Sequence, residues 1–157
     1  SNQNSPSQNA RPNQENLIPS LDYNITWTDK TRKHHEIWDE LQYTLTLNKH
    51  PNAVAVLLRV LVEISVDHFI RKNPTIGVAE NLPLRKKVGK VGEFLYDQNK
   101  ITKKYFSDIM RVQQSENLIS IETMNRFVHS SNLSPAPRDL TSLWNTLSEF
   151  VQICINE

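Results

Sequence analysis

The stretch that decides the fold runs from Pro51 to Lys72 and reads PNAVAVLLRVLVEISVDHFIRK. Proline fits the first turn of a helix, where its missing N–H would have no helical partner. A helix without a polar face is normally the buried centre of a bundle. The stretch therefore predicts an all-α fold built around one central helix. Its apolar residues cover nearly the whole circumference of that helix: Val54, Val56, Leu57, Leu58, Val60, Leu61, Val62, Ile64, Val66, Phe69 and Ile70.

Shorter amphipathic stretches on both sides predict the other helices of the bundle. They begin near Thr28 or Asp29, Leu84, Thr102, Ser120 and Arg138, and the first of them is predicted to reach about Asn48. Between Leu21 and Trp27, apolar and polar residues alternate, which favours a short extended segment packed across the domain. Three glycines in 157 residues are too few for an all-β fold or a glycine-rich phosphate loop. We predict a single bundle of about five to six helices.

The first twenty residues differ in composition from the rest of the chain. Asn, Gln, Ser and Pro dominate them, and Ala10 is the only apolar residue before Leu17. Such a segment cannot bury enough surface to offset the entropy cost of ordering. We predict a disordered tail or linker over residues 1–20 and a helical domain over residues 21–157. The domain is expected to be the C-terminal module of a larger protein, with upstream domains of that protein among its partners.

Charge and cysteine content restrict the function classes. Eighteen Lys and Arg oppose seventeen Asp and Glu, so attraction to nucleic acid requires a local patch. A single cysteine, Cys154, permits no internal disulfide, fits a cytoplasmic protein and is expected in the core. His34 and His35 have no partner at metal-ligand spacing, so we expect neither a metal nor a cofactor. No apolar run or signal peptide predicts a membrane location.

Three charged residues interrupt the central helix at four-residue steps. Arg59, Glu63 and Asp67 therefore stack along one stripe of that helix. Charges in a central helix must be paired or must face a cleft. Two interpretations stay open: an ion pair that ties helices together, and a stripe that lines a functional groove.

A second polar set lies in the helix that follows Ser120. Asn125 and His129 are one turn apart, and Arg126 precedes His129 by three residues. An amide, a guanidinium and an imidazole on neighbouring positions can grip a phosphate and move a proton near neutral pH. Asn125, Arg126 and His129 are the candidate catalytic residues, although a histidine near a helix end also serves as a cap.

These features resemble the HEPN superfamily. The resemblance covers roughly Lys33 to Ile155 and depends on two segments, the run Leu57-Leu58-Arg59-Val60-Leu61-Val62-Glu63 and the Asn125 to His129 segment followed by a Pro-containing loop and a closing helix. It implies a small helical bundle that dimerises, in a bacterial protein of antiviral defence or nucleic-acid processing. Active members are metal-independent endoribonucleases in which four to six residues separate an Arg from the His that follows it.

The sequence departs from that catalytic signature. The family spacing would place the Arg at Glu122, Thr123 or Met124, whereas Arg126 stands three residues before His129. Relatives with Asn-x-x-x-His in place of the signature are regarded as binding or dimerisation modules, and the chain resembles those more closely. We therefore expect a binding and homodimerisation module. The alternative is an endoribonuclease in which two chains pool Arg126 and His129 across a dimer interface.

A basic region suggests a third function. The candidate nucleic-acid-binding residues are Arg85, Lys86, Lys87, Lys90, Lys103 and Lys104. Such a patch could follow an RNA or DNA backbone and would make binding sensitive to salt. The same charges also fit an ordinary solvated helix face. In the same region, the spacing of Gly89 and Gly92 permits close approach of a neighbouring helix.

Overall fold

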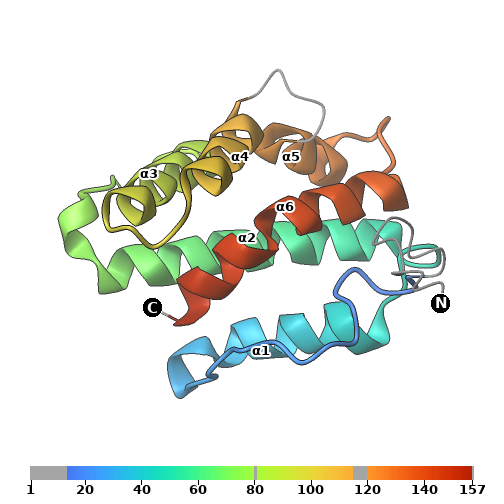
Figure 1. Cartoon of the computed structure of the whole chain (residues 1–157). Helices are drawn as coiled ribbons and strands as arrows, with labels where there is room; N and C mark the ends of the chain where they lie inside the picture. Colours follow the sequence, from blue (N-terminus) through green and yellow to red (C-terminus); the bar gives the residue numbers. More distant parts are fainter. Residues whose placement is uncertain (1–13, 80, 115–119, 157) are drawn as a thin grey trace, which may run out of the picture.

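A computed structural model describes residues 14–79, 81–114 and 120–156 (Figure 1). The described residues form helices and no strand, which confirms the all-α prediction. The elements are η1 (Asp29–Thr31), α1 (Arg32–Asp39), η2 (Glu40–Thr44), α2 (Pro51–Lys72), η3 (Pro74–Ile76), α3 (Leu84–Asp97), α4 (Lys103–Gln113), α5 (Ile121–His129) and α6 (Pro137–Asn156). None of these helices is long and apolar enough to cross a membrane.

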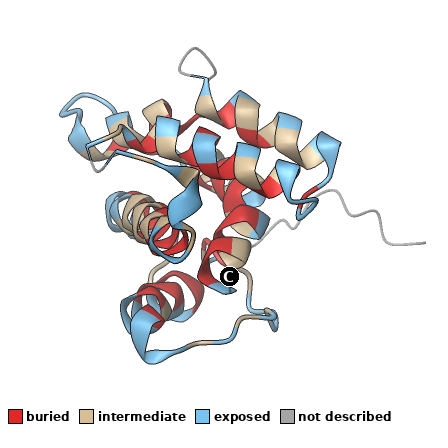
Figure 2. Ribbon diagram, turned by 90° about the vertical axis from the view of Figure 1, so that its left-hand side faces the viewer, coloured by how far each residue is buried: buried red, intermediate tan, exposed pale blue. Residues whose placement is uncertain are grey.

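Helix α2 is the centre of the bundle, as its sequence predicts. It packs against α1, α3, α5 and α6, and α1 and α5 lie on opposite sides of it (Figure 1). Leu58, Leu61 and Phe69 of α2 are at most 2% exposed, and Trp144 and Phe150 of α6 are equally buried. Figure 2 shows the buried residues on the helix sides that face one another. The large apolar surface removed from water by this packing is the main source of stability.

Helices α3 and α4 approach each other through glycine. A Cβ atom added at Gly92 would lie 3.0 Å from Ile109 Cγ2 and 3.2 Å from Met110 Cε, and one at Gly89 would lie 3.3 Å from Gln113 Cγ. The predicted close approach is therefore confirmed. A side chain at position 92 would push α4 away from α3 unless its neighbours moved.

The ordered domain begins earlier than predicted. Leu17 and Ile18 are fully buried in the core. The amide of Leu47 donates to the carbonyl of Glu15 at 2.8 Å, and Asn16 Nδ2 donates to the carbonyl of Leu45 at 2.7 Å. The boundary predicted at residue 21 is thus wrong, because two apolar side chains and these hydrogen bonds anchor the preceding segment. The tail predicted over residues 1–13 lies outside the described residues.

The first main helix is shorter than predicted. Helix α1 continues into the π-helical turn η2, and the chain becomes extended at Leu45 instead of Asn48. The reason is that the Leu45 carbonyl and the Leu47 amide form the hydrogen bonds to the N-terminal segment described above. Within a helix these backbone groups would bond other residues of the helix.

Residues 21–27, here named the strap, run extended across α1, as the alternating pattern predicts. Tyr23, Ile25 and Trp27 pack against the core and are half-buried. Asn156 fixes the strap from the C-terminal end of α6: its Oδ1 accepts from the Thr26 amide at 2.9 Å, and its Nδ2 donates to the Asn24 carbonyl at 2.8 Å. Asn156 therefore ties the strap, which lies near the N-terminal end of the described residues, to the C-terminal end of α6.

Candidate functional site

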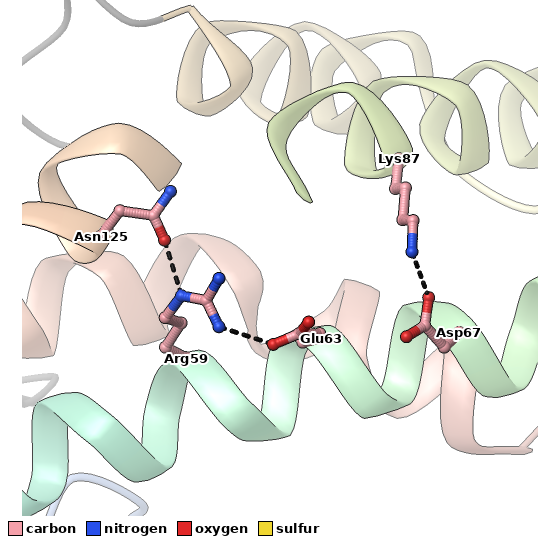
Figure 3. A network of polar contacts seen from close by, with 5 residues as sticks. All are labelled: Arg59, Glu63, Asp67, Lys87 and Asn125. Atoms are coloured by element: carbon pink, nitrogen blue, oxygen red, sulfur yellow. Dashed lines mark hydrogen bonds and ion pairs between the residues drawn. The ribbon is translucent and has the colours of Figure 1, made fainter. Parts of the chain in front are cut away.

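The polar stripe on α2 contacts α5 through one arginine (Figure 3). Arg59 Nε donates to Asn125 Oδ1 at 2.7 Å, and Arg59 Nη1 donates to Glu63 Oε2 at 2.6 Å. The side chain of Arg59 is 24% exposed and that of Glu63 is 41% exposed. The charge of Arg59 is thus balanced by a carboxylate one turn away, while an amide from α5 occupies a second donor.

The third member of the stripe contacts α3. Lys87 Nζ donates to Asp67 Oδ1 at 2.9 Å, and the lysine side chain is only 14% exposed (Figure 3). Partial burial makes this pair less screened than a surface ion pair. Two of the three stripe residues, Arg59 and Asp67, therefore join α2 to a neighbouring helix.

Local sequence sets the start and orientation of α5. Ser120 caps the helix, because its Oγ accepts from the Thr123 amide at 3.1 Å. Ile121, Met124 and Phe127 then point into the core and are at most 6% exposed. This apolar spacing fixes the rotation of α5, and with it the side on which each polar residue lies.

The three candidate catalytic residues do not gather at one point. Asn125 is half-buried and faces Arg59, whereas Arg126 and His129 are exposed. Arg126 Nη2 lies 3.5 Å from Thr123 Oγ1, at the limit of a hydrogen bond. Within residues 120–156 and the other described ranges, no hydrogen bond joins Arg126 to His129. Arg126 and His129 thus lie on the exposed side of α5, whereas Asn125 faces α2.

The basic patch is weaker than its residue count suggests. Lys86 and Lys90 of α3 and Lys103 and Lys104 of α4 are exposed, whereas Arg85 is half-buried. Lys87 is bound to Asp67, and Lys104 lies 3.8 Å from Asp108. Glu93 and Asp97 continue the outer stripe of α3 that carries Lys86 and Lys90, and both are exposed. Acidic neighbours therefore reduce the positive field that a nucleic acid would meet.

Two buried histidines lie between α1 and α2, and no pattern in the sequence indicates that they pair. His34 is 4% and His68 5% exposed, and their ring centroids are 5.6 Å apart in an edge-to-face arrangement. Burial lowers the pKa of His34, which the nearby Ile64 backbone partly opposes. Neither ring nitrogen of His34 makes a hydrogen bond of good geometry among the described residues.

The charges around this pair also favour neutral imidazoles. Burial is the main reason that the pKa of His68 is lowered, and His34, Lys72, Arg71 and Lys30 lower it further. His34 shares the apolar face of α1 with Ile37 and Trp38. The position of His34 on this apolar face can be predicted from the sequence. Its contact with His68, 34 residues later, cannot.

The remaining expectations concern metal and thiol chemistry. Within the described ranges, no three His, Cys, Asp or Glu side chains gather in a way that could hold a metal ion. Cys154 is fully buried, and burial raises the pKa of its thiol. The thiolate needed for nucleophilic attack is therefore disfavoured, in agreement with the predicted core position.

Comparison with protein-family models, curated proteins and solved structures gives no match to this chain. The resemblance to the HEPN superfamily accordingly stands on the two sequence segments quoted above.

Proposed function

We propose that this chain is a HEPN-like module that binds partners and self-associates, and that it does not cleave RNA by itself. The observation that carries the proposal is the hydrogen bond between Asn125 and Arg59. It places the first residue of the Asn-x-x-x-His pattern in a contact between helices. The amide oxygen of Asn125 therefore serves to position α5 on α2.

The exposure of Arg126 and His129 supports the non-catalytic part of the proposal. Cleavage through the 2′-hydroxyl of RNA needs a base near that hydroxyl and a cation near the phosphate. The interactions of both groups with the RNA are stronger in a site that excludes water and holds the groups in place. An exposed arginine and an exposed histidine without a mutual contact lack this arrangement within one chain.

Apolar exposure beside the same helices supports self-association. Val56, three residues before Arg59 on α2, is 42% exposed, and Leu133, four residues after His129, is 37% exposed. Arg59, three residues after Val56, donates to Asn125 of α5, so this part of α2 lies beside α5 (Figure 3). A contact with two-fold symmetry would remove Val56 and Leu133 of both copies from water. We assign a second copy of this chain as the partner of this surface.

Light scattering of the purified protein over a concentration series tests the assignment. We expect twice the mass of one chain for the wild type and a single-chain mass for Val56→Asp, because a buried, unpaired carboxylate is costly. Leu21→Asp is the matched control, since Leu21 is 52% exposed and lies on the strap beside α1. A wild type that stays monomeric at the highest soluble concentration contradicts the proposal.

The alternative function uses the same dimer. If the two-fold contact brought Arg126 of one copy beside His129 of the other, the pair could act on RNA as a composite endoribonuclease. The exposure of both side chains leaves them accessible for such a site. His129→Ala would then abolish cleavage while leaving both the mass and the stability of the protein unchanged.

The biological setting follows the family resemblance. We place the module in a larger bacterial protein concerned with antiviral defence or nucleic-acid processing. A salt-sensitive RNA affinity that Lys86→Glu and Lys90→Glu remove would instead support the nucleic-acid-binding function.

A further inference from the structure

A small cavity lies between the strap and the outer side of α1 and η2. Its volume is about 160 Å³, which is below the range of pockets for drug-sized or nucleotide ligands. Tyr23 and Trp27 of the strap contribute to its wall, and Tyr43 of η2 contributes from the other side. The cavity therefore has room for the end of one side chain or an ion of that size.

Ring contacts hold two of these aromatic side chains in place. Trp27 stacks on His35 with 4.4 Å between centroids and 3° between planes. Tyr23 meets Trp38 edge-on at 5.1 Å. Since Trp38 is 3% exposed, it anchors this wall in the core. The cavity wall is thus formed before any ligand arrives, which lowers the entropy cost of binding.

Apolar exposure is concentrated at the same place. Tyr43 is 61% and Leu21 52% exposed, and both line the cavity. They are the two most exposed large hydrophobic residues in the described ranges. The accessible surface within the cavity is mainly polar, so the exposed area of these two side chains lies chiefly at its rim, where the aliphatic stem of a ligand could contact it.

The cavity is also negative. Asp22 and Asp39 line it, whereas no lysine or arginine does. Asp39 Oδ2 lies 3.5 Å from His35 Nε2, and its side chain is 54% exposed, so the carboxylate keeps accessible oxygen atoms. The faces of aromatic rings carry partial negative charge and attract cations. Carboxylates and ring faces together repel phosphate and favour an organic cation.

We propose that this cavity binds the cationic end of a basic side chain, an alkylguanidinium or alkylammonium ion, between the strap and α1. Asp22 and Asp39 supply the charge, and Tyr23, Trp27 and Tyr43 supply the aromatic surface. The aliphatic stem of the side chain lies against Leu21. This site lies on the α1 side of α2, away from α5, and is independent of the self-association proposed above.

Titration of the full chain with N-acetyl-arginine amide tests the proposal. The indole Nε1–H signals of the three tryptophans are followed by NMR, and that of Trp27 is assigned with Trp27→Phe. We expect a saturable shift of the Trp27 signal. N-acetyl-citrulline amide is the matched probe, because it has the same shape without the charge, and it should produce no saturable shift.

Two substitutions isolate the charge. Asp22→Asn and Asp39→Asn change exposed residues and keep the shape of the cavity, so the fold should survive. Together they should weaken the affinity for arginine amide several-fold, whereas Asp97→Asn, an exposed residue on α3, should not. Equal shifts with arginine and citrulline amides, or an affinity that Asp22→Asn and Asp39→Asn leave unchanged, overturn the proposal.

A tripeptide with a central arginine distinguishes the two sources of such a cation. Tighter binding than that of the amide identifies a polypeptide partner, and equal binding identifies a free small molecule. The assay does not depend on the mass of the protein, so its failure is separate from failure of the self-association proposal.

Discussion

Helices α1 and α5 both pack on α2, from opposite sides, but different side chains meet at the two contacts (Figure 1). Asn125 of α5 accepts a hydrogen bond from Arg59, so its amide oxygen has a partner. His34 of α1 instead faces His68 of α2, and both imidazoles must stay uncharged to remain buried. The Asn125 amide carries no proton that titrates near neutral pH, whereas the packing of α1 depends on two buried imidazoles that can be protonated.

The outer sides of the two helices differ as well. Arg126 and His129 project from α5 as exposed positive or titratable groups. The outer side of α1 instead carries the negative, aromatic cavity that includes Trp27 and Asp39. Each helix thus packs its inner side on α2, and the exposed outer sides of the two helices carry side chains of different charge.

The largest expected effect separates the inner and outer sides of α5. Met124→Ala should lower the free energy of unfolding by about 2–5 kcal/mol, because it leaves a cavity in the core. Met124 is fully buried, whereas Arg126, two residues later, is exposed. Arg126→Ala should stay within about 0.5 kcal/mol of the wild type. Urea unfolding measures both, and equal losses would contradict the assignment of sides.

A smaller loss of stability is expected from substitution of Asn125, whose side-chain amide holds α5 against α2. Asn125→Ala leaves Arg59 Nε without its acceptor and should cost about 1–3 kcal/mol. Asn125→Asp keeps an acceptor oxygen at the same position and should retain most of the stability. A double-mutant cycle with Arg59→Met should give a coupling energy of about 0.5–3 kcal/mol. Additive losses would show that the two side chains do not interact.

The contact between α1 and α2 should make the stability of the protein fall in acid. In the folded protein the pKa values of His34 and His68 lie below the ordinary value of 6.5, chiefly because of burial. Between the folded and unfolded pKa values, the unfolded chain binds protons that the folded chain does not. The free energy of unfolding should therefore be highest above pH 6.5 and fall as the pH drops below it. Once the folded histidines are also protonated, it should level off.

Urea unfolding between about pH 7.5 and 5.5 measures this loss of stability. The ordinary pKa values of carboxylates lie below this pH range, so the loss reports on histidines. His34→Phe removes one of the two titrating groups and should flatten the dependence. His129→Ala is the matched control, because it removes an exposed histidine that lies outside the buried pair. A stability that does not change with pH in the wild type would mean that the pair is not held neutral.

Sequence alone predicted the elements that depend on local pattern. Helix α2 has the predicted bounds because its apolar residues and Pro51 act within the segment itself. The burial of Leu17 and Ile18 could not be predicted, because two apolar residues in a polar segment carry little signal. Their anchoring depends on hydrogen bonds to Leu45 and Leu47, about thirty positions away.

The candidate site shows the same division. The stacking of Arg59 and Glu63 follows from four-residue spacing, and the structure contains their ion pair. The partner of Arg59 on α5 is 66 residues away. The sequence placed Asn125 and His129 on one face, but it could not show that Asn125 contacts α2 while His129 is exposed. That distinction required the packing of the whole bundle.

The most direct test of the central claim is the incubation of the wild-type protein, over the concentration series used for light scattering, with labelled single-stranded RNA and no added metal. The proposal of a module that does not cleave RNA predicts that the RNA stays intact, for the wild type and for His129→Ala alike. Cleavage by the wild type alone, with cyclic-phosphate ends, would contradict it and would establish the composite endoribonuclease.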